Sequence, residues 1–350
     1  MPARSKWQSL PTEAINPSTL GIDKLSAADI VDLMFNEDRK MLAAVHRERE
    51  RIAVGVEMLS GALRKGGRMM FVGAGTSGRL GILESAEMPP TFSTDPDIVQ
   101  AVMAGGRDAI FAAREGVEDN YEEGARAITR LRPTKKDVVI GVSASGMTQF
   151  VRGALTRARK AGARVIFVTC DPGTELQTFV DLTIAPGVGA EVIAGSTRLK
   201  AGTATKLVLN ILTTAAMVRI GKTYGNLMVD VQTGSEKLKD RARRIVNIVT
   251  GLEYDDADRL LKRAQWNVKA AIVMQKTGLT YAKAIGRLRK AHDSMREALG
   301  EDIEPRLRGL LQGHAEGTAV TTGNSVMTGT IPSPDSAQRT QRREAAPRSK

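Results

Sequence analysis

Short apolar segments alternate with longer segments of helical periodicity through the middle of the chain, and this alternation most constrains the fold. The apolar segments cover residues 69–72, 99–103, 138–142, 165–169 and 182–184. Continuous apolar runs of this length are typical of strands buried on both faces, and the helical segments between them supply the crossovers that parallel strands need. The pattern predicts an α/β fold, a doubly wound parallel sheet with helices on both faces.

Helical segments flank this central region on both sides. Before it, Ser26 and Asp29 resemble a capping box that opens N-terminal helices up to Arg64. After it, residues 250–299 have the apolar spacing of a small three-helix module, and the chain beyond His314 has few large apolar residues. We therefore expect an N-terminal arm with helices in residues 1–65, a sheet domain in 66–235, a C-terminal helical module in 236–305 and a disordered tail in 306–350.

Composition and charge exclude several classes of protein. The single cysteine, Cys170, cannot form an intramolecular disulfide, and His46, His292 and His314 are too far apart in the sequence to suggest a metal site. Because no apolar run reaches ~18 residues and no apolar signal segment opens the chain, we expect a cytoplasmic protein with no membrane span. The net charge of +12 is compatible with nucleic acid, with an anionic small substrate or simply with solubility. Without a zinc finger or aromatics among the basic runs, we expect no nucleic-acid partner.

Two glycine- and hydroxyl-rich loops follow the first and third predicted strands. The first, Gly73–Arg79, reads GAGTSGR, and the second, Ser143–Thr148, reads SASGMT. Both begin at the carboxyl ends of parallel strands, where such sheets bind ligands. Glycines let backbone N–H groups approach an anion, hydroxyls add donors, and the N-terminus of the following helix favours a phosphate. The candidate phosphate ligands are Gly75, Thr76, Ser77, Ser143, Ser145 and Thr148.

A plain strand-to-helix turn is the alternative for each loop, and the first loop also has the GxGxxG spacing of dinucleotide-binding proteins. The second predicted strand, however, ends in Ala104-Gly105-Gly106 and not in an acidic ribose-binding residue. Two hydroxyl-rich loops in one sheet favour a compact sugar phosphate. A third segment, residues 195–203, offers Ser196 and Thr197 as helix caps or anion ligands and Lys200 as a positive charge.

Any acid–base catalysis by this chain would be carried out by carboxylates, because the sequence suggests no metal cluster, reactive cysteine or histidine triad. Glu84 and Glu87 stand three residues apart on the helix after the first loop, which Pro89-Pro90 should end. Glu115 and Glu118 form a second pair with the same spacing. Spacing alone does not distinguish such pairs from ordinary solvated surface charge.

Several of these segments together resemble the N-acetylmuramic acid 6-phosphate etherases, which are members of the sugar isomerase (SIS) domain family and are related to the glucokinase regulatory proteins. The matching segments are TEAINPSTLGIDKLS (12–26), GAGTSGRLGILESAEMPPTF (73–92), AGG (104–106), EGVEDN (115–120), VIGVSASG (139–146), GAEVIAGSTRLKAGTATKLVLN (189–210) and GKTYGNLMVDV (221–231). The segment 189–210 is similar to a signature that etherases and regulators share, and ESAEMPPTF favours the etherases. One departure lies at residues 145–150, which read SGMTQF where the family usually has SGRTPY.

The resemblance implies an SIS domain with a C-terminal helical module, and a homodimer with its sites near the interface. It implies cleavage of the D-lactyl ether of N-acetylmuramic acid 6-phosphate, an anionic amino-sugar phosphate, in peptidoglycan recycling and without a cofactor. By motif match, Glu87 and Glu118 correspond to the two catalytic glutamates of the family. Two alternatives stay open: a non-catalytic sugar-phosphate-sensing regulator of the same family, and an aldose–ketose isomerase with the same fold.

Overall fold

The computed structural model describes residues 10–321 of the chain. The chain divides after Asp302 into two compact units, and the second begins with helix α13 (Glu304–Thr321). This helix covers part of the tail for which the sequence predicts disorder. Its sequence repeats Leu307, Leu310 and Leu311 at helical spacing, which accounts for the difference. Residues 322–350, the remainder of that tail, lie outside the described part.

A parallel sheet forms the centre of the first unit. Its strands are β1 (Met69–Gly73), β2 (Val99–Met103), β3 (Val138–Val142), β4 (Arg164–Val168) and β5 (Leu182–Ile184), in the order β2-β1-β3-β4-β5. All neighbouring pairs are parallel. Gly73 is in register with Met103 and with Val142, so β1, β2 and β3 end at the same edge. The predicted parallel α/β sheet is confirmed.

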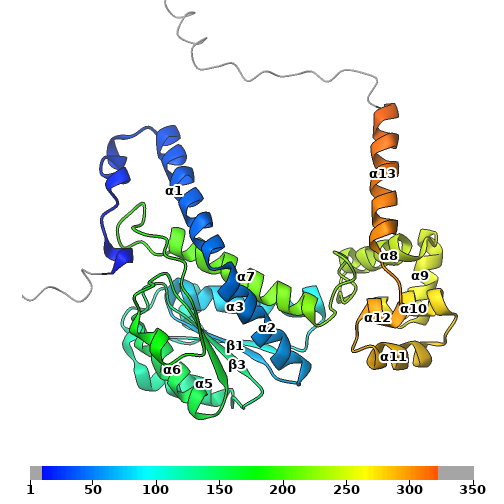
Figure 1. Ribbon diagram of the computed structural model, residues 1–350, viewed down its shortest axis with the longest axis horizontal. Helices are drawn as coiled ribbons and strands as arrows, with labels where there is room; N and C mark the ends of the chain where they lie inside the picture. Colours follow the sequence, from blue (N-terminus) through cyan, green and yellow to red (C-terminus); the bar gives the residue numbers. More distant parts are fainter. Residues whose placement is uncertain (1–9, 322–350) are drawn as a thin grey trace, which may run out of the picture. The chain divides into compact units, whose positions relative to one another are not determined.

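Helices cover both faces of this sheet (Figure 1). On one face lie α1 (Ala27–Arg47), α2 (Arg49–Arg64), α3 (Gly75–Phe92) and α7 (Lys200–Arg219), and on the other lie α5 (Tyr121–Arg130) and α6 (Gln149–Lys160). Alternate residues of β1 face the two layers: Met69 and Phe71 pack with the first group, whereas Met70 and Val72 pack with the second. The continuous apolar run of β1 is therefore needed because both of its faces are buried.

Helix α7 is long and apolar enough to cross a membrane by length and composition alone. However, 56% of its most apolar 18-residue window is buried within the protein. It packs against α1, α2 and α3, and Leu209 and Leu212 are fully buried. These contacts make α7 a core helix of the sheet layer.

Helix α3 continues past the two prolines that the sequence predicts as its end. Pro89 and Pro90 lie in its last turn, where each lacks the N–H that would donate to the carbonyl four residues earlier. Met88 and Phe92 are both 4% exposed, so burying this turn favours the helix. Ser93 then ends it in the left-handed conformation and donates its N–H to the Pro89 carbonyl over 2.9 Å.

The C-terminal part of the first unit has more helices than the three predicted. They are α8 (Glu236–Thr250), α9 (Tyr254–Arg263), α10 (Val268–Thr277), α11 (Tyr281–Lys290) and α12 (Met295–Leu299). Helix α10 is the centre of this group, since it contacts the other four and its residues 268–274 are all buried. Helix α8 adds Ile245 and Val246 to the packing, although its basic sequence resembles that of a solvated helix.

Candidate active site

A polar pocket of about 520 Å³ lies at the carboxyl edge of β1, β2 and β3. Residues from the two hydroxyl-rich loops, from the turn at 113–118, from the segment at 195–202 and from the N-terminal segment line it. The structure brings together the following residues predicted from the sequence: Gly75, Thr76, Ser77, Ser143, Ser145, Thr148, Thr197 and Glu118. Leu10, Glu13, Arg79, Arg114 and Glu115 also contribute to its walls.

The first loop opens helix α3 directly onto the pocket. Gly75 has φ +53°, a left-handed conformation that suits glycine, and this turns the chain from β1 into the helix. The helix begins its hydrogen bonding at Gly78, whose N–H donates to the Ala74 carbonyl over 3.1 Å. The N–H groups of residues 75–77 have no partner inside the helix, and free N–H groups at a helix N-terminus favour an anion.

The second loop holds its hydroxyls in place by internal hydrogen bonds. Gly146, with φ +73°, donates its N–H to the Ser143 carbonyl, and the Ser143 and Thr148 hydroxyls lie 2.8 Å apart. Thr148 is the residue before α6. The departures from the family pattern point elsewhere: Phe150 is 1% exposed and packs in the core, and Met147 and Gln149 are outside the described pocket lining.

The third segment contributes Thr197 to the pocket, but Ser196 and Lys200 are outside the described lining. The sequence predicts that Lys200 binds the substrate; instead, its ammonium lies 2.7 Å from Glu37 Oε2, and the side chain is 2% exposed. The N-terminus of α7 is also occupied. The Lys200 and Ala201 N–H groups donate to the buried Glu191 carboxylate over 3.0 and 2.9 Å. Glu191 thus takes the position that the sequence suggests for a substrate anion.

Arg79 fastens the turn that carries the pocket's acidic residues. Its guanidinium donates to the carbonyls of Ala109 and Ile110 over 2.8 and 2.9 Å, which holds α4 (Asp108–Phe111) against α3. The chain then passes to the 3-10 helix η4 (Val117–Asp119), which contains Glu118. Glu118 is partly exposed and lines the pocket, and the N-terminal segment supplies Glu13 to the same lining.

The two glutamates of α3 have different surroundings. Glu84 is 2% exposed and accepts hydrogen bonds from Lys206, Asn210 and Thr213 of α7 over 2.7, 2.9 and 2.7 Å, so it joins two helices. Glu87 is exposed and is outside the described pocket lining. It comes eleven residues after Thr76, a distance of about 16 Å along a helix. One chain therefore does not bring Glu87 into its own pocket.

Other chemical groups contribute little to this site. Burial raises the pKa of the Cys170 thiol to about 12, which keeps it protonated and unreactive. Within the described residues, no group of three or more His, Cys, Asp and Glu side chains could hold a metal ion. The chemistry of the pocket therefore depends on its hydroxyls, N–H groups, carboxylates and arginines.

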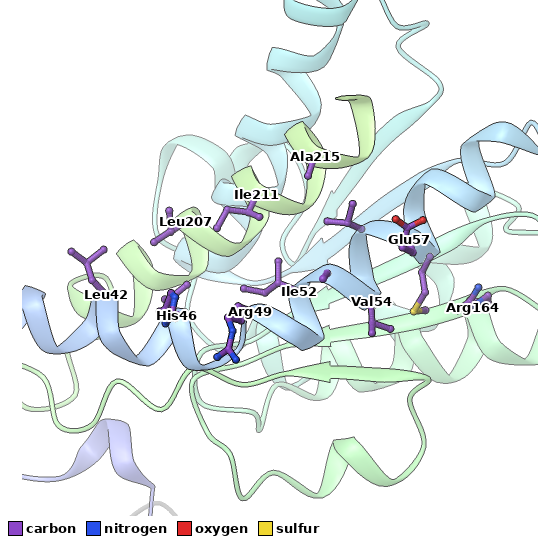
Figure 2. Close-up of a pocket in the computed structure, with 14 residues that line it drawn as sticks. Leu42, His46, Arg49, Ile52, Val54, Glu57, Arg164, Leu207, Ile211 and Ala215 are labelled. Atoms are coloured by element: carbon purple, nitrogen blue, oxygen red, sulfur yellow. The ribbon is translucent and has the colours of Figure 1, made fainter. Parts of the chain in front are cut away.

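A larger hollow of about 920 Å³ lies elsewhere and is mainly apolar. Figure 2 shows its labelled side chains along α1 and α2 on one side, including Leu42 and Ile52, and along α7 on the other, including Leu207 and Ile211. Further exposed apolar residues continue the helical spacing of these lining residues: Val31 and Phe35 on α1, and Val218 on α7. This surface, which we call the α1–α7 face, lacks the converging hydroxyls of the polar pocket and suits a protein partner better than a sugar.

The comparison with known families agrees with the sheet and its loops. Residues 51–159 match the family model of the glucokinase regulatory protein N-terminal SIS domain. The fold and this match together identify residues 51–159 as part of an SIS domain. The structure of a phosphoheptose isomerase from Francisella tularensis is also similar, at 18% identity and a TM-score of 0.45 over 55% of this chain and 100% of that chain. A likeness this distant supports no conclusion about function.

Curated relatives match far more of the chain. The chain is 46% identical to the N-acetylmuramic acid 6-phosphate etherase of Microcystis aeruginosa over 84% of this chain and 97% of that protein. It is 48% identical to the etherase of Trichormus variabilis, over 83% and 94%, and 47% identical to that of Clostridioides difficile, over 83% and 96%. The chain belongs to the N-acetylmuramic acid 6-phosphate etherase family. This membership favours the etherases over the regulators, whose domain model matches only residues 51–159.

Proposed function

We propose that this protein cleaves the D-lactyl ether of N-acetylmuramic acid 6-phosphate in the cytoplasm, and so releases D-lactate and N-acetylglucosamine 6-phosphate during peptidoglycan recycling. The observation that carries the proposal is the polar pocket, where two hydroxyl-rich loops and Glu118 meet in a chain 46–48% identical to etherases. A substrate phosphate fits the N–H groups of residues 75–77 and the hydroxyls of Thr76, Ser77 and Ser145.

The reaction needs two acid–base groups because an alkoxide is a poor leaving group. Opening of the sugar ring exposes an aldehyde at C1, which acidifies the proton on C2. Glu118 removes this proton while Glu87 protonates the lactyl oxygen on C3, so that the C3–O bond breaks and lactate leaves. Water then adds to C3 of the unsaturated aldehyde, with Glu87 as the base, and C2 regains a proton from Glu118. Each acid–base role typically contributes about 10²–10⁴-fold to the rate.

Glu87 lies outside the described lining of its own chain's pocket, which supports a role for a second copy of the chain. We propose a homodimer formed through the α1–α7 face, in which Glu87 of one subunit completes the pocket of the other. Leu83 lies one turn before Glu87 on α3, which packs against α7, and it is 41% exposed, so an exposed apolar side chain adjoins this glutamate.

Lactate release from N-acetylmuramic acid 6-phosphate tests this function. We expect Glu118→Gln and Glu87→Gln each to lower the rate by about 10²–10⁴-fold with little change in folding, because glutamine keeps the size of the side chain. Glu122→Gln, an exposed carboxylate on α5, serves as the control and keeps the wild-type rate. Wild-type rates in both glutamate variants would contradict the assignment. Tight sugar-phosphate binding without lactate release from the wild-type protein would support a regulator instead.

A further inference from the structure

The N-terminal segment is fastened to the pocket by buried hydrogen bonds. It contains the 3-10 helices η1 (Pro11–Glu13), η2 (Pro17–Thr19) and η3 (Ile22–Lys24). Gly195 donates its N–H to the Thr12 carbonyl over 3.2 Å, and the Thr19 hydroxyl donates to the Val192 carbonyl over 2.9 Å. Asn16 donates to Glu37 Oε2 over 2.9 Å. Thr12, Asn16 and Thr19 are all buried, so the backbone of this segment has a defined position.

This segment places a carboxylate, Glu13, on the wall of the pocket. The glycine at 195 leaves room for it, since a Cβ there would lie 3.0 Å from Glu13 Oε2, and Gly195 has φ +76°. Among the described residues, no hydrogen bond or ion pair engages the Glu13 carboxylate. Its oxygens can therefore accept hydrogen bonds from a ligand in the pocket.

The proposed etherase reaction leaves one proton transfer without a residue. The substrate is a closed hemiacetal, and it opens only if O1 loses a proton and the ring oxygen O5 gains one. Glu118 and Glu87 are assigned to C2 and C3. The described lining of the pocket contains no His, Lys, Tyr or Cys, and arginine does not exchange protons at neutral pH. Of the described lining that one subunit supplies, only Glu13 and Glu115 remain. Glu115 shares the turn of Glu118, whereas Glu13 comes from a separate segment beside Gly195.

We propose that Glu13 is the acid–base residue that opens the sugar ring, an inference that rests on the proposed etherase function. The Glu13 carboxylate takes the proton from the O1 hydroxyl as the C1=O bond forms. The C1–O5 bond breaks, and O5 receives that proton from the same carboxyl group. No net proton is gained or lost, and closing the ring of the product reverses these steps.

Anomer exchange tests ring opening separately from lactate release. The probe is N-acetylglucosamine 6-phosphate, whose α and β anomers interconvert only through the open chain, and exchange NMR measures the rate. The Glu118→Gln protein, in which the chemistry at C2 is blocked, should still accelerate this exchange. Adding Glu13→Gln should lower the protein-dependent rate by about 10²–10⁴-fold. Asp23→Asn, an exposed carboxylate in η3, is the matched control and should leave the rate unchanged.

The outcomes separate the two proposals. Accelerated exchange that persists in the Glu13→Gln/Glu118→Gln protein, or no acceleration by any form, would overturn the role of Glu13. A Glu13→Gln protein with weaker binding of N-acetylglucosamine 6-phosphate but normal exchange at saturation would also overturn it, because Glu13 would then be a positioning residue. If the wild-type protein accelerates exchange through Glu13 but releases no lactate, the etherase function fails while the ring-opening role stands.

Discussion

The ammonium of Lys200 lies 2.7 Å from Glu37 Oε2, and the two side chains are 2% and 3% exposed. This ion pair joins the first turn of α7 to α1. Because Asn16 donates to the same Glu37 oxygen, the N-terminal segment is fastened at the same place. One buried carboxylate thus connects three segments that are distant in the sequence, and two of them supply walls of the polar pocket.

We expect this ion pair to contribute to the free energy of unfolding at neutral pH and to lose that contribution in acid. Burial alone raises the pKa of Glu37, but hydrogen bonds from Lys200, Lys40 and Asn16 outweigh it and lower the pKa from 4.5 to about 2. Because the folded-state pKa lies below the unfolded one, the stabilisation is complete above the unfolded value and is lost as the pH falls towards the folded value. Glu37→Gln should lower the free energy of unfolding at neutral pH by about 3–5 kcal/mol, since it leaves the Lys200 charge buried and unpaired.

Urea unfolding across that acid range measures this effect. The Glu37→Gln protein should show a flatter dependence of stability on pH than the wild type, and the double variant Glu37→Gln/Lys200→Met should regain part of the loss. Equal pH profiles for the wild type and Glu37→Gln would show that the pair does not carry the acid sensitivity.

We expect the two hydroxyl-rich loops to contribute measurably to the affinity for the substrate phosphate. Thr76→Val and Ser145→Ala each remove one donor to the charged phosphate, and a hydrogen bond to a charged group contributes about 1.5–3 kcal/mol, or about 10- to 150-fold in binding. Each variant should raise the KM for the sugar phosphate by that factor, and should weaken competitive inhibition by inorganic phosphate by the same factor. Thr156→Val, whose hydroxyl bonds within α6, is the control. Unchanged inhibition by phosphate would mean that the loops hold another part of the substrate.

If the α1–α7 face is the dimer interface, a charge placed on it should abolish dimerisation and activity together. Leu42 lines the apolar hollow and is 53% exposed, so Leu42→Asp leaves the isolated fold intact but puts a charge into the proposed interface. Analytical ultracentrifugation should show monomers, and lactate release should fall because Glu87 no longer reaches a pocket. Leu311→Asp, at a 70% exposed leucine on α13, is the control. A dimeric and active Leu42→Asp protein would place the interface elsewhere.

Mixed dimers test which subunit supplies Glu87. In a dimer of one Glu87→Gln chain and one Glu118→Gln chain, one pocket has both glutamates intact if Glu87 acts across the interface. Equal mixing with free subunit exchange gives mixed dimers in about half of the molecules, so about a quarter of wild-type activity should return. If both glutamates act within one chain, the mixture stays as inactive as its components.

The sheet and its loops are the part of this molecule that sequence predicts well. Strands such as β1 and β3 are buried on both faces, so their apolar runs are unbroken and easily located. The hydroxyl-rich loops follow directly at their carboxyl ends, and the register of Gly73 with Val142 then brings the two loops together. A parallel sheet is therefore enough to predict that the two loops lie close together.

The sequence does not predict the roles of residues that depend on contacts with residues far away in the chain. A lysine beside a hydroxyl-rich segment has the same local sequence whether it binds a phosphate or, like Lys200, a glutamate 163 residues away. Glu84 and Glu87 share a helix and a spacing, and only the packing of α7 shows that one is buried and the other exposed. Glu13 lies within a segment that matches the family, but only the folded N-terminal segment brings it to the pocket.

Isotope labelling tests most directly the claim that lactate leaves by elimination at C2–C3. The purified protein is incubated with N-acetylmuramic acid 6-phosphate in ¹⁸O-water, and both products are examined by mass spectrometry. The proposed mechanism breaks the bond between C3 and the lactyl oxygen, so it predicts ¹⁸O at C3 of N-acetylglucosamine 6-phosphate and unlabelled D-lactate. Label in the lactate hydroxyl with none at C3, or no lactate at all, would contradict it.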